Sequence, residues 1–157
     1  MRGYYGVGVL NMKTGINYGT LFRSAACFDA DLLFLIGRRF EKQASDTMAS
    51  QRHIPLLEYA DIDDFLAHRP YDCQLVGVEM VDGSRNLPDI VHPERALYLL
   101  GPEDGSIPRR LLDECQMVVR IPTRYCLNVA VAGSIVVYDR RAKGEMMQEE
   151  MADGRHQ

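Results

Sequence analysis

The 157-residue sequence lacks a long hydrophobic run, and none of its apolar segments approaches the roughly 20 residues that a transmembrane helix needs. Its N-terminus also lacks the basic region, the long apolar core and the small-residue cleavage site that mark a secretory signal peptide. A membrane-spanning protein is therefore not indicated. We expect a cytoplasmic protein.

Cysteines are few, and their spacing matches neither a zinc site nor a disulfide framework. The four cysteines show no C-x-x-C pattern and the histidines show no H-x-x-x-H pattern. Three of the cysteines lie in or beside apolar runs, where a free cysteine is usually a buried thiol. We expect no metal site among the candidates, which are Cys27, Cys73, Cys115 and Cys126.

The sequence also lacks an excess of positive charge. Its net charge of −4 argues against a protein that coats nucleic acid without specificity, although a local basic face is still compatible with docking on a phosphate backbone. The apolar fraction of 46% and the charged fraction of 25% are those of a folded globular protein. A chain of this length buries about two thirds of its unfolded surface as one domain.

Apolar runs that alternate with helical patterns predict an α/β fold with a mainly parallel sheet flanked by helices. The predicted strands are Tyr4–Leu10, Asp31–Ile36, Leu56–Tyr59, Gln74–Glu79, Ala96–Leu100 and Met117–Arg120. The predicted helices are about Asn17–Phe28, a short one near Asp46–Gln51, Asp61–His68, one after Pro108 and a long one after Asn128. We expect one domain over residues 1–143 and a polar, frayed tail over 144–157.

The stretch Tyr98–Arg140 is the candidate functional centre. Twice in this stretch an apolar run is followed by a loop that proline or glycine interrupts, and then by a helix. Open α/β sheets bind their ligands at the loops that follow the carboxyl ends of strands. The loops around Gly101–Pro108 and Ile121–Asn128 are therefore expected to wall one pocket.

Arg23 is a candidate site residue because of its place on the first predicted helix. At about 100° per residue it lies roughly opposite the apolar stripe of Leu21, Ala25 and Phe28. It therefore faces either solvent or a site, and these residues alone leave both possibilities open. Asn17, at the start of the same helix, fits an ordinary helix cap equally well.

Three segments together resemble a known family. Asn17–Ala25 (NYGTLFRSA) is similar to N-x-G-x-x-x-R-x-A, Leu100–Pro108 (LGPEDGSIP) to L-G-x-E-x-x-G-I/L-P, and Ile121–Ala132 (IPTRYCLNVAVA) to I-P…S-L-N-V-A-x-A. In this order and spacing they resemble the three motifs of the SPOUT superfamily, in its SpoU (TrmH-like) branch of RNA ribose 2′-O-methyltransferases. The resemblance extends over nearly the whole chain.

The resemblance implies a SPOUT fold in which the C-terminal part threads through a loop to form a trefoil knot, a feature that periodicity alone argues against. It implies S-adenosylmethionine as cofactor, no metal, and methyl transfer to a ribose 2′-hydroxyl of tRNA or rRNA. It also implies a homodimer with the active site built across the interface. Because no added RNA-binding domain is evident, we expect a chain close to the minimal catalytic unit.

Site residues are carried over by motif position. The implied catalytic residues are Arg23, Asn17, Glu103 and Asn128, and the implied cofactor-binding residues are Val78, Gly101, Ile121, Cys126 and Leu127. The predicted RNA-binding residues are Arg23 and the basic residues Arg38, Arg39, Arg52 and Arg124, with Arg109 and Arg110 as further basic residues that could hold phosphates. Basic residues of this kind also fit an ordinary solvated surface, and the sequence leaves both interpretations open. The family assigns activation of the 2′-hydroxyl to the arginine of the first motif. A guanidinium is a poor base, since its pKa exceeds about 12, so we favour a role for Arg23 in placing a phosphate and stabilising the developing alkoxide.

Cys126 departs from the family pattern, because serine commonly precedes the Leu-Asn pair of the third motif. Sulfur is a weaker hydrogen-bonding atom than a hydroxyl oxygen. One alternative is therefore a weakly active or inactive knotted module that only binds RNA or cofactor. Another is a SPOUT enzyme that methylates a base instead of ribose, against which Arg23 argues.

Overall fold

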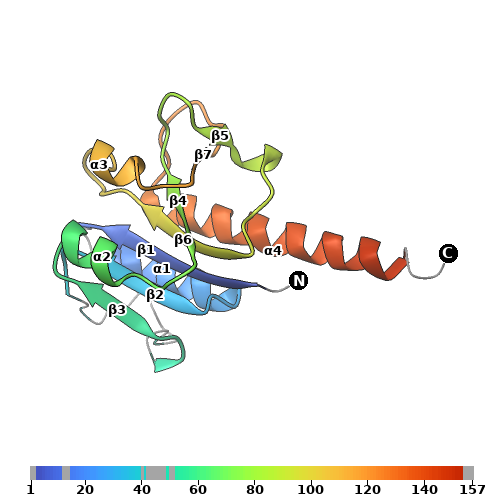
Figure 1. Cartoon of the computed structure of the whole chain (residues 1–157), viewed down its shortest axis with the longest axis horizontal. Helices are drawn as coiled ribbons and strands as arrows, with labels where there is room; N and C mark the ends of the chain where they lie inside the picture. The colour runs from blue at the N-terminus through green and yellow to red at the C-terminus, as the bar shows by residue number, and fades with distance from the viewer. Residues whose placement is uncertain (1–2, 12–14, 40, 42–48, 50–51, 154–157) are drawn as a thin grey trace.

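The computed structural model describes residues 3–11, 15–39, 41, 49 and 52–153. Within these residues the chain forms a seven-stranded sheet of order β3-β2-β1-β6-β4-β7-β5, in which each recorded strand pair is parallel (Figure 1). The strands are β1 (Tyr4–Leu10), β2 (Leu32–Ile36), β3 (Leu56–Tyr59), β4 (Gln74–Val78), β5 (Arg85–Asn86), β6 (Arg95–Leu100) and β7 (Met117–Arg120).

Six of these strands confirm the sequence prediction to within a residue or two at each end. The exception is β5, a two-residue strand of polar side chains that pairs with β7 at the edge of the sheet and has no apolar pattern to reveal it. The short helix predicted near Asp46–Gln51 falls almost entirely outside the described residues.

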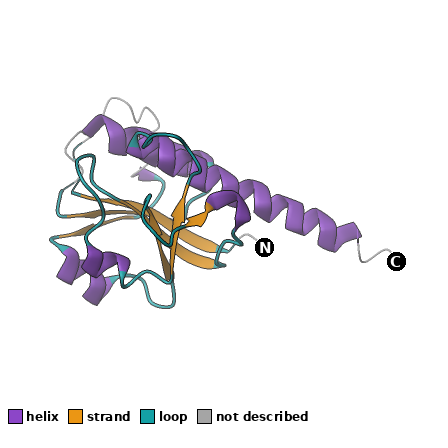
Figure 2. Ribbon diagram, turned by 90° about the horizontal axis from the view of Figure 1, so that it is seen from above, coloured by secondary structure: helices purple, strands orange, loops and turns teal. Residues whose placement is uncertain are grey.

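Helices cover both faces of the sheet (Figure 2). On one face lie α1 (Gly15–Cys27) and α4 (Val129–Asp153), and their apolar side chains form one core cluster with the strands. On the other face α2 (Ile62–His68) and α3 (Arg109–Leu112) contribute to a second cluster. A 3₁₀ turn, η2 (Leu87–Asp89), follows β5. A mainly parallel sheet covered on both faces is the expected α/β architecture.

Side-chain alternation along the strands explains the two clusters. Successive side chains of a strand point to opposite faces of a sheet. In β6, Tyr98 and Leu100 therefore pack beneath α1 and α4, while Leu97 and Leu99 pack toward α2 and α3. The sheet consequently lies between two buried layers.

A glycine brings α1 and α4 close together. A Cβ atom at Gly133 would lie 2.3 Å from Cδ1 of Leu21, which is too close for any side chain. At the next residue of α4, the hydroxyls of Ser134 and Ser24 form a hydrogen bond between the two helices at 2.8 Å. This packing places Asn17, near the start of α1, next to Asn128, which directly precedes α4.

The last helix is longer than the sequence predicted. We expected the chain to fray from about Gly144, whereas α4 continues to Asp153 (Figure 1). A single glycine costs a helix only about 1 kcal/mol, and the residues that follow it are mostly Glu, Met, Gln and Ala, which favour helices. Polar composition alone therefore did not mark the end of the helix.

The strand order is compatible with the implied trefoil knot, and the threading itself stays a prediction.

In the described part of the chain, no helix combines the length and apolar character that crossing a membrane requires.

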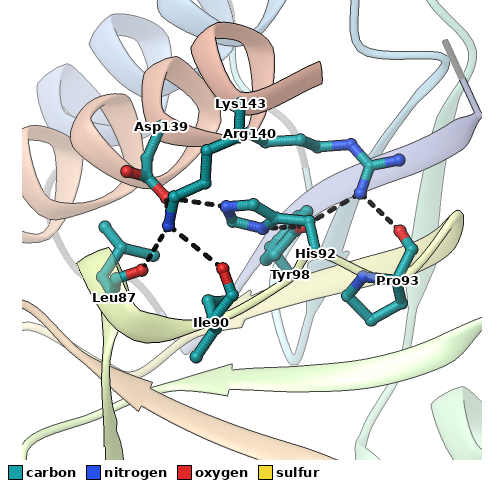
Figure 3. Close-up of polar contacts among 8 residues, drawn as sticks. All are labelled: Leu87, Ile90, His92, Pro93, Tyr98, Asp139, Arg140 and Lys143. Carbon is teal, nitrogen blue, oxygen red and sulfur yellow. Dashed lines mark hydrogen bonds and ion pairs between the residues drawn. The ribbon is translucent and has the colours of Figure 1, made fainter. Parts of the chain in front are cut away.

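A polar network ties α4 to the segment between β5 and β6 (Figure 3). Lys143 forms an ion pair with Asp139 at 2.8 Å and donates to the backbone carbonyls of Leu87 and Ile90 at 2.7 and 3.1 Å. Arg140, which is buried, donates to two further carbonyls of the same segment at 2.6 and 2.9 Å. The network satisfies backbone groups that a non-helical segment would otherwise leave unpaired.

His92 lies at the centre of this network in its neutral form. Arg140 donates to the hydroxyl of Tyr98 at 3.1 Å, and burial raises the pKa of Tyr98 to about 12, so this hydroxyl keeps its own proton. The hydroxyl therefore donates to Nδ1 of His92 (2.6 Å), while Nε2–H of His92 donates to Asp139 (2.8 Å). Burial lowers the pKa of His92; the Asp139 carboxylate opposes this shift, and the nearby cations Arg140 and Lys143 add to it.

The buried imidazole predicts a pH-dependent stability. The pKa of His92 is lower in the folded chain than its ordinary value of 6.5, so stability is lost as the pH falls below 6.5 and the unfolded chain takes up a proton that the folded chain resists. His92→Gln, which does not titrate, should lose less thermal stability than the wild type between about pH 8 and pH 5. Thermal melts measure this, with His68→Gln, at the exposed end of α2, as a control for the loss of an imidazole. Equal slopes for wild type and His92→Gln would contradict it.

Candidate active site

Three segments that are far apart in the sequence meet at the side-chain amide of Asn17. Its Nδ2 donates to Oε1 of Glu103 at 2.8 Å, and its Oδ1 accepts from Nδ2 of Asn128 at 3.0 Å. Asn17 lies in α1, Glu103 in the loop after β6, and Asn128 at the start of α4. Three of the predicted catalytic residues therefore form one hydrogen-bonded chain.

Asn128 has a second structural role. Its Oδ1 accepts from the backbone N–H of Ala130 at 2.9 Å and of Val131 at 3.3 Å, which is the geometry of a helix N-cap. The oxygen of this amide thus accepts from free backbone N–H groups at the start of α4, and its nitrogen donates to Asn17 and orients it. Asn17 itself does not precede its helix, because α1 begins at Gly15, so its side chain serves the Glu103–Asn128 connection.

A cavity opens beside this chain, at the carboxyl ends of β4 and β7. Four of the five predicted cofactor-binding residues line it, and they come from the end of β4 and from the loop after β7. The lining residues are Val78, Glu79, Met80, Arg120, Ile121, Thr123, Cys126, Leu127 and Ala132. These loops meet because β4 and β7 are parallel neighbours, so both strands end at the same edge of the sheet.

Gly101, the fifth predicted residue, borders this cavity through Glu79. A Cβ atom at Gly101 would lie 3.2 Å from both Oε2 of Glu79 and Cγ1 of Ile107. The glycine therefore lets the loop after β6 lie directly against the cavity wall.

Glu79 is a site residue that the sequence prediction missed. Its Oε2 accepts from the backbone N–H of Ile107 at 2.9 Å, and its Oε1 accepts from the N–H of Met80 at 3.1 Å. The carboxylate thereby fastens the loop after β6 to the end of β4. A signal was present, since Glu79 is the first polar residue after a buried apolar strand, at the end where ligands bind.

Arg23 lies on the exposed surface of α1. It has no recorded hydrogen bond or ion pair with any described residue, and it does not belong to the described lining of the cavity. The structure therefore brings Asn17, Glu103 and Asn128 together but leaves Arg23 outside the cavity of its own chain.

Three of the predicted RNA-binding arginines lie at the carboxyl edge of the sheet, and Arg52 lies elsewhere. Arg38 and Arg39 follow the carboxyl end of β2, on the same edge of the sheet as the cavity, and Arg124 lies in the loop after β7. Arg38 also forms an ion pair with Glu41 at 3.7 Å. Arg52 is exposed and follows residues that the structure does not describe. Arg109 and Arg110, the further basic residues of α3, form ion pairs with Asp113 and Asp63.

A family comparison agrees with this arrangement. The model of the SpoU rRNA Methylase family matches residues 6–138, which include all three motif segments and both sides of the cavity. The chain belongs to the SpoU rRNA methylase family.

Several proteins resemble this SpoU-family chain. The mouse (Mus musculus) protein named tRNA (guanosine(18)-2′-O)-methyltransferase TARBP1 is 27% identical over 136 residues, covering 78% of this chain and 8% of that protein. A structure of AdoMet-bound rRNA methyltransferase from Sinorhizobium meliloti has a TM-score of 0.78 and 25% identity, covering 91% of this chain and 57% of that one. The A. aeolicus TrmH/SpoU tRNA modifying enzyme has a TM-score of 0.80 at 17% identity, covering 92% and 77%. The chain thus spans a small part of the mouse protein and little more than half of the S. meliloti chain.

Metal-ligating side chains do not gather near this site. Among the described residues, no group of three or more His, Cys, Asp or Glu side chains is placed to hold a metal ion.

If the Glu79 carboxylate holds the loop after β6, removing it should make that loop more flexible. Removing a hydrogen bond to a charged acceptor costs about 1.5–3 kcal/mol, so Glu79→Ala should speed amide hydrogen exchange of the Gly101–Pro108 segment by about 10- to 100-fold. Hydrogen-exchange mass spectrometry measures the change, and the matched control is Glu114→Ala, on the surface near Arg69. Unchanged exchange in Glu79→Ala would show that the carboxylate does not hold the loop.

Proposed function

We propose that this chain transfers a methyl group from S-adenosylmethionine to a ribose 2′-hydroxyl of tRNA or rRNA. The observation that carries the proposal is the hydrogen-bonded chain Glu103–Asn17–Asn128, which joins the three motif segments beside the cavity. The name of the mouse relative, a tRNA 2′-O-methyltransferase, and the AdoMet-bound S. meliloti relative support it.

The residues that line the cavity match the adenosyl part of S-adenosylmethionine in chemical character. Val78, Ile121 and Leu127 supply apolar walls, and strand-end loops supply backbone N–H and C=O groups that can fix a purine. Gly101 allows the backbone of the loop after β6 to approach closely. When bound, S-adenosylmethionine supplies a methyl group activated by a sulfonium.

Arg23 positions the acceptor in this mechanism. Its guanidinium donates in a fork to a phosphate oxygen next to the reacting ribose and stabilises the negative charge that develops on the 2′-oxygen. The hydroxyl proton passes to the adjacent phosphate, since a guanidinium cannot accept it. Asn17 and Asn128 hold the reacting segment in near-attack geometry, and Glu103 acts as a positioning residue through its bond to Asn17.

A second copy of the chain completes the site in our proposal. An apolar groove lies on the outer surface between α1 and α4, where the side chains of Val131 and Tyr138 are 47% and 59% exposed. Its lining residues are Thr20, Phe28, Val131, Ser134, Ile135 and Tyr138. Thr20 lies one helical turn from Arg23, so a copy seated on this groove approaches Arg23. This supports a homodimer whose site combines Arg23 of one copy with the cavity of the other.

Two alternatives are separated by the reaction product. A binding module without turnover is favoured by Cys126, which lines the cavity at the position where the family commonly has serine. A base methyltransferase would leave the ribose unmodified. A 2′-O-methyl group blocks alkaline cleavage of the adjoining phosphodiester and a base methyl group does not, so alkaline hydrolysis of the methylated RNA identifies the product.

Replacing Arg23 should abolish turnover and spare cofactor binding. Arg23→Ala is expected to lower methyl incorporation from labelled S-adenosylmethionine into RNA by at least about 100-fold, the effect of losing one donor to a developing oxyanion. Arg23→Lys should also lose most activity, because an ammonium cannot form the fork. Calorimetry should show unchanged cofactor affinity in both variants.

The matched control is Arg95→Ala, at the amino end of β6 and away from the cavity. Full activity of Arg23→Ala would overturn the assigned role. RNA from cells that lack the gene serves as the substrate, because its target sites are unmethylated. If the wild-type protein makes no 2′-O-methyl product on this RNA, the proposed function is overturned.

Shared sites predict complementation between two inactive variants. Arg23→Ala keeps its cavity, and Gly101→Leu fills the space beside Glu79 and keeps its arginine. Co-expressed copies should regain part of the wild-type activity, because a mixed dimer has one intact site. Tyr138→Glu, in the groove, should give monomers by analytical ultracentrifugation and lose activity. Lack of complementation, or an active monomer, would contradict the shared site.

A further inference from the structure

The loop after β7 presents a large aromatic side chain to solvent. Tyr125 is 78% exposed, and the neighbouring residues from Pro122 to Asn128 are exposed as well. Single exposed aliphatic residues are common on protein surfaces, but exposed aromatic rings are more often used for recognition.

Hydrogen bonds hold the backbone of this loop, although Tyr125 is exposed to solvent. The hydroxyl of Thr123 donates to the carbonyl oxygen of Tyr125 at 2.8 Å. Three residues further on, Asn128 is fixed by its bonds to Asn17 and to the start of α4. The Thr123 bond orders the turn at Tyr125 and Asn128 anchors the loop on its carboxyl side, which lowers the entropy cost of binding a partner there.

Tyr125 does not belong to the lining of the cavity that its neighbours form. Those neighbours are Thr123, Cys126 and Leu127. An exposed residue of this loop that is outside the lining can meet a substrate that enters from solvent at the rim of the cavity.

Arg124 adds a positive charge beside the ring. Its side chain is exposed and has no recorded hydrogen bond or ion pair with a described residue. The α3 arginines differ, since Arg109 and Arg110 are paired with carboxylates. Arg124 is thus the cation of this loop that remains available to an anionic partner.

We propose that Tyr125 and Arg124 form a docking platform for single-stranded RNA at the rim of the cavity. The Tyr125 ring stacks on an unpaired base that flanks the methylated nucleotide, and the Arg124 guanidinium contacts a backbone phosphate. This inference rests on the proposed function. Stacking on aromatic rings together with phosphate contacts is how proteins hold unpaired RNA, and it tolerates any base because each base has a π-face.

The chain contains a matched control for the platform. Tyr71 is also a highly exposed tyrosine, with 93% of its side chain accessible. It precedes β4, at the amino edge of the parallel sheet, whereas Tyr125 follows β7 at the carboxyl edge. The two rings are therefore alike in exposure and lie on opposite sides of the domain.

The absence of tryptophan from the sequence allows a direct test. Tyr125→Trp and Tyr71→Trp each introduce the single indole of the protein, and stacking of a base on an indole quenches its emission. Unfractionated tRNA, and rRNA in a second arm, should quench the indole of Tyr125→Trp and leave that of Tyr71→Trp unchanged. This readout does not depend on methyl transfer.

Turnover and binding measurements complete the test. Tyr125→Ala should raise the KM for RNA by about 5- to 150-fold while Tyr125→Phe, which keeps the stacking ring, stays near the wild type. Arg124→Ala should reduce the slope of log affinity against log salt by about 0.7, the contribution of one phosphate on a single strand. Cofactor affinity should be unchanged in all three variants, and Tyr71→Ala should behave as the wild type.

The outcomes separate this inference from the proposed function. An active wild type with an unquenched indole in Tyr125→Trp and an unchanged KM in Tyr125→Ala would overturn the platform alone. Weaker cofactor binding by Tyr125→Ala would also overturn it, because the ring would then cover the small ligand. A quenched indole in a protein that makes no 2′-O-methyl product would support the platform and refute the proposed reaction.

Discussion

The site depends on one side-chain amide that is used at both ends. The nitrogen of Asn17 can only donate and its oxygen can only accept, so a carboxylate on one side and an amide donor on the other are both required. Glu103 and Asn128 meet these requirements at 2.8 and 3.0 Å. Because each partner comes from a different segment, the amide fixes the relative positions of helix α1, the loop after β6 and the start of α4.

The parallel sheet makes this meeting possible. The strands β6, β4 and β7 are adjacent and run in the same direction, so their loops leave from one edge. Gly133 lets α1 and α4 pack closely on one face and brings their first turns to the same edge. The buried network around His92 and Arg140 holds the rest of α4 against the segment that leads into β6. The cavity thus rests on rigid elements although loops line it.

The sequence predicted most of the fold, because buried parallel strands are continuous apolar runs that local composition reveals. It missed β5, whose two polar residues form a strand only through pairing with β7. It grouped the site residues only through a resemblance, since no local pattern shows that Asn17 contacts Glu103 and Asn128. The place of Glu79 after an apolar strand could have marked it as a candidate, but its role could not be predicted, because its partner, the N–H of Ile107, is a backbone group 28 positions away.

The bond between Asn17 and Asn128 joins positions that are 111 residues apart. During synthesis the first motif therefore waits without its partner until almost the whole domain has left the ribosome. A fragment that ends before Asn128 lacks one of the three segments and therefore contains no assembled site. Assembly from distant segments therefore ties formation of the candidate site to the folding of most of the domain.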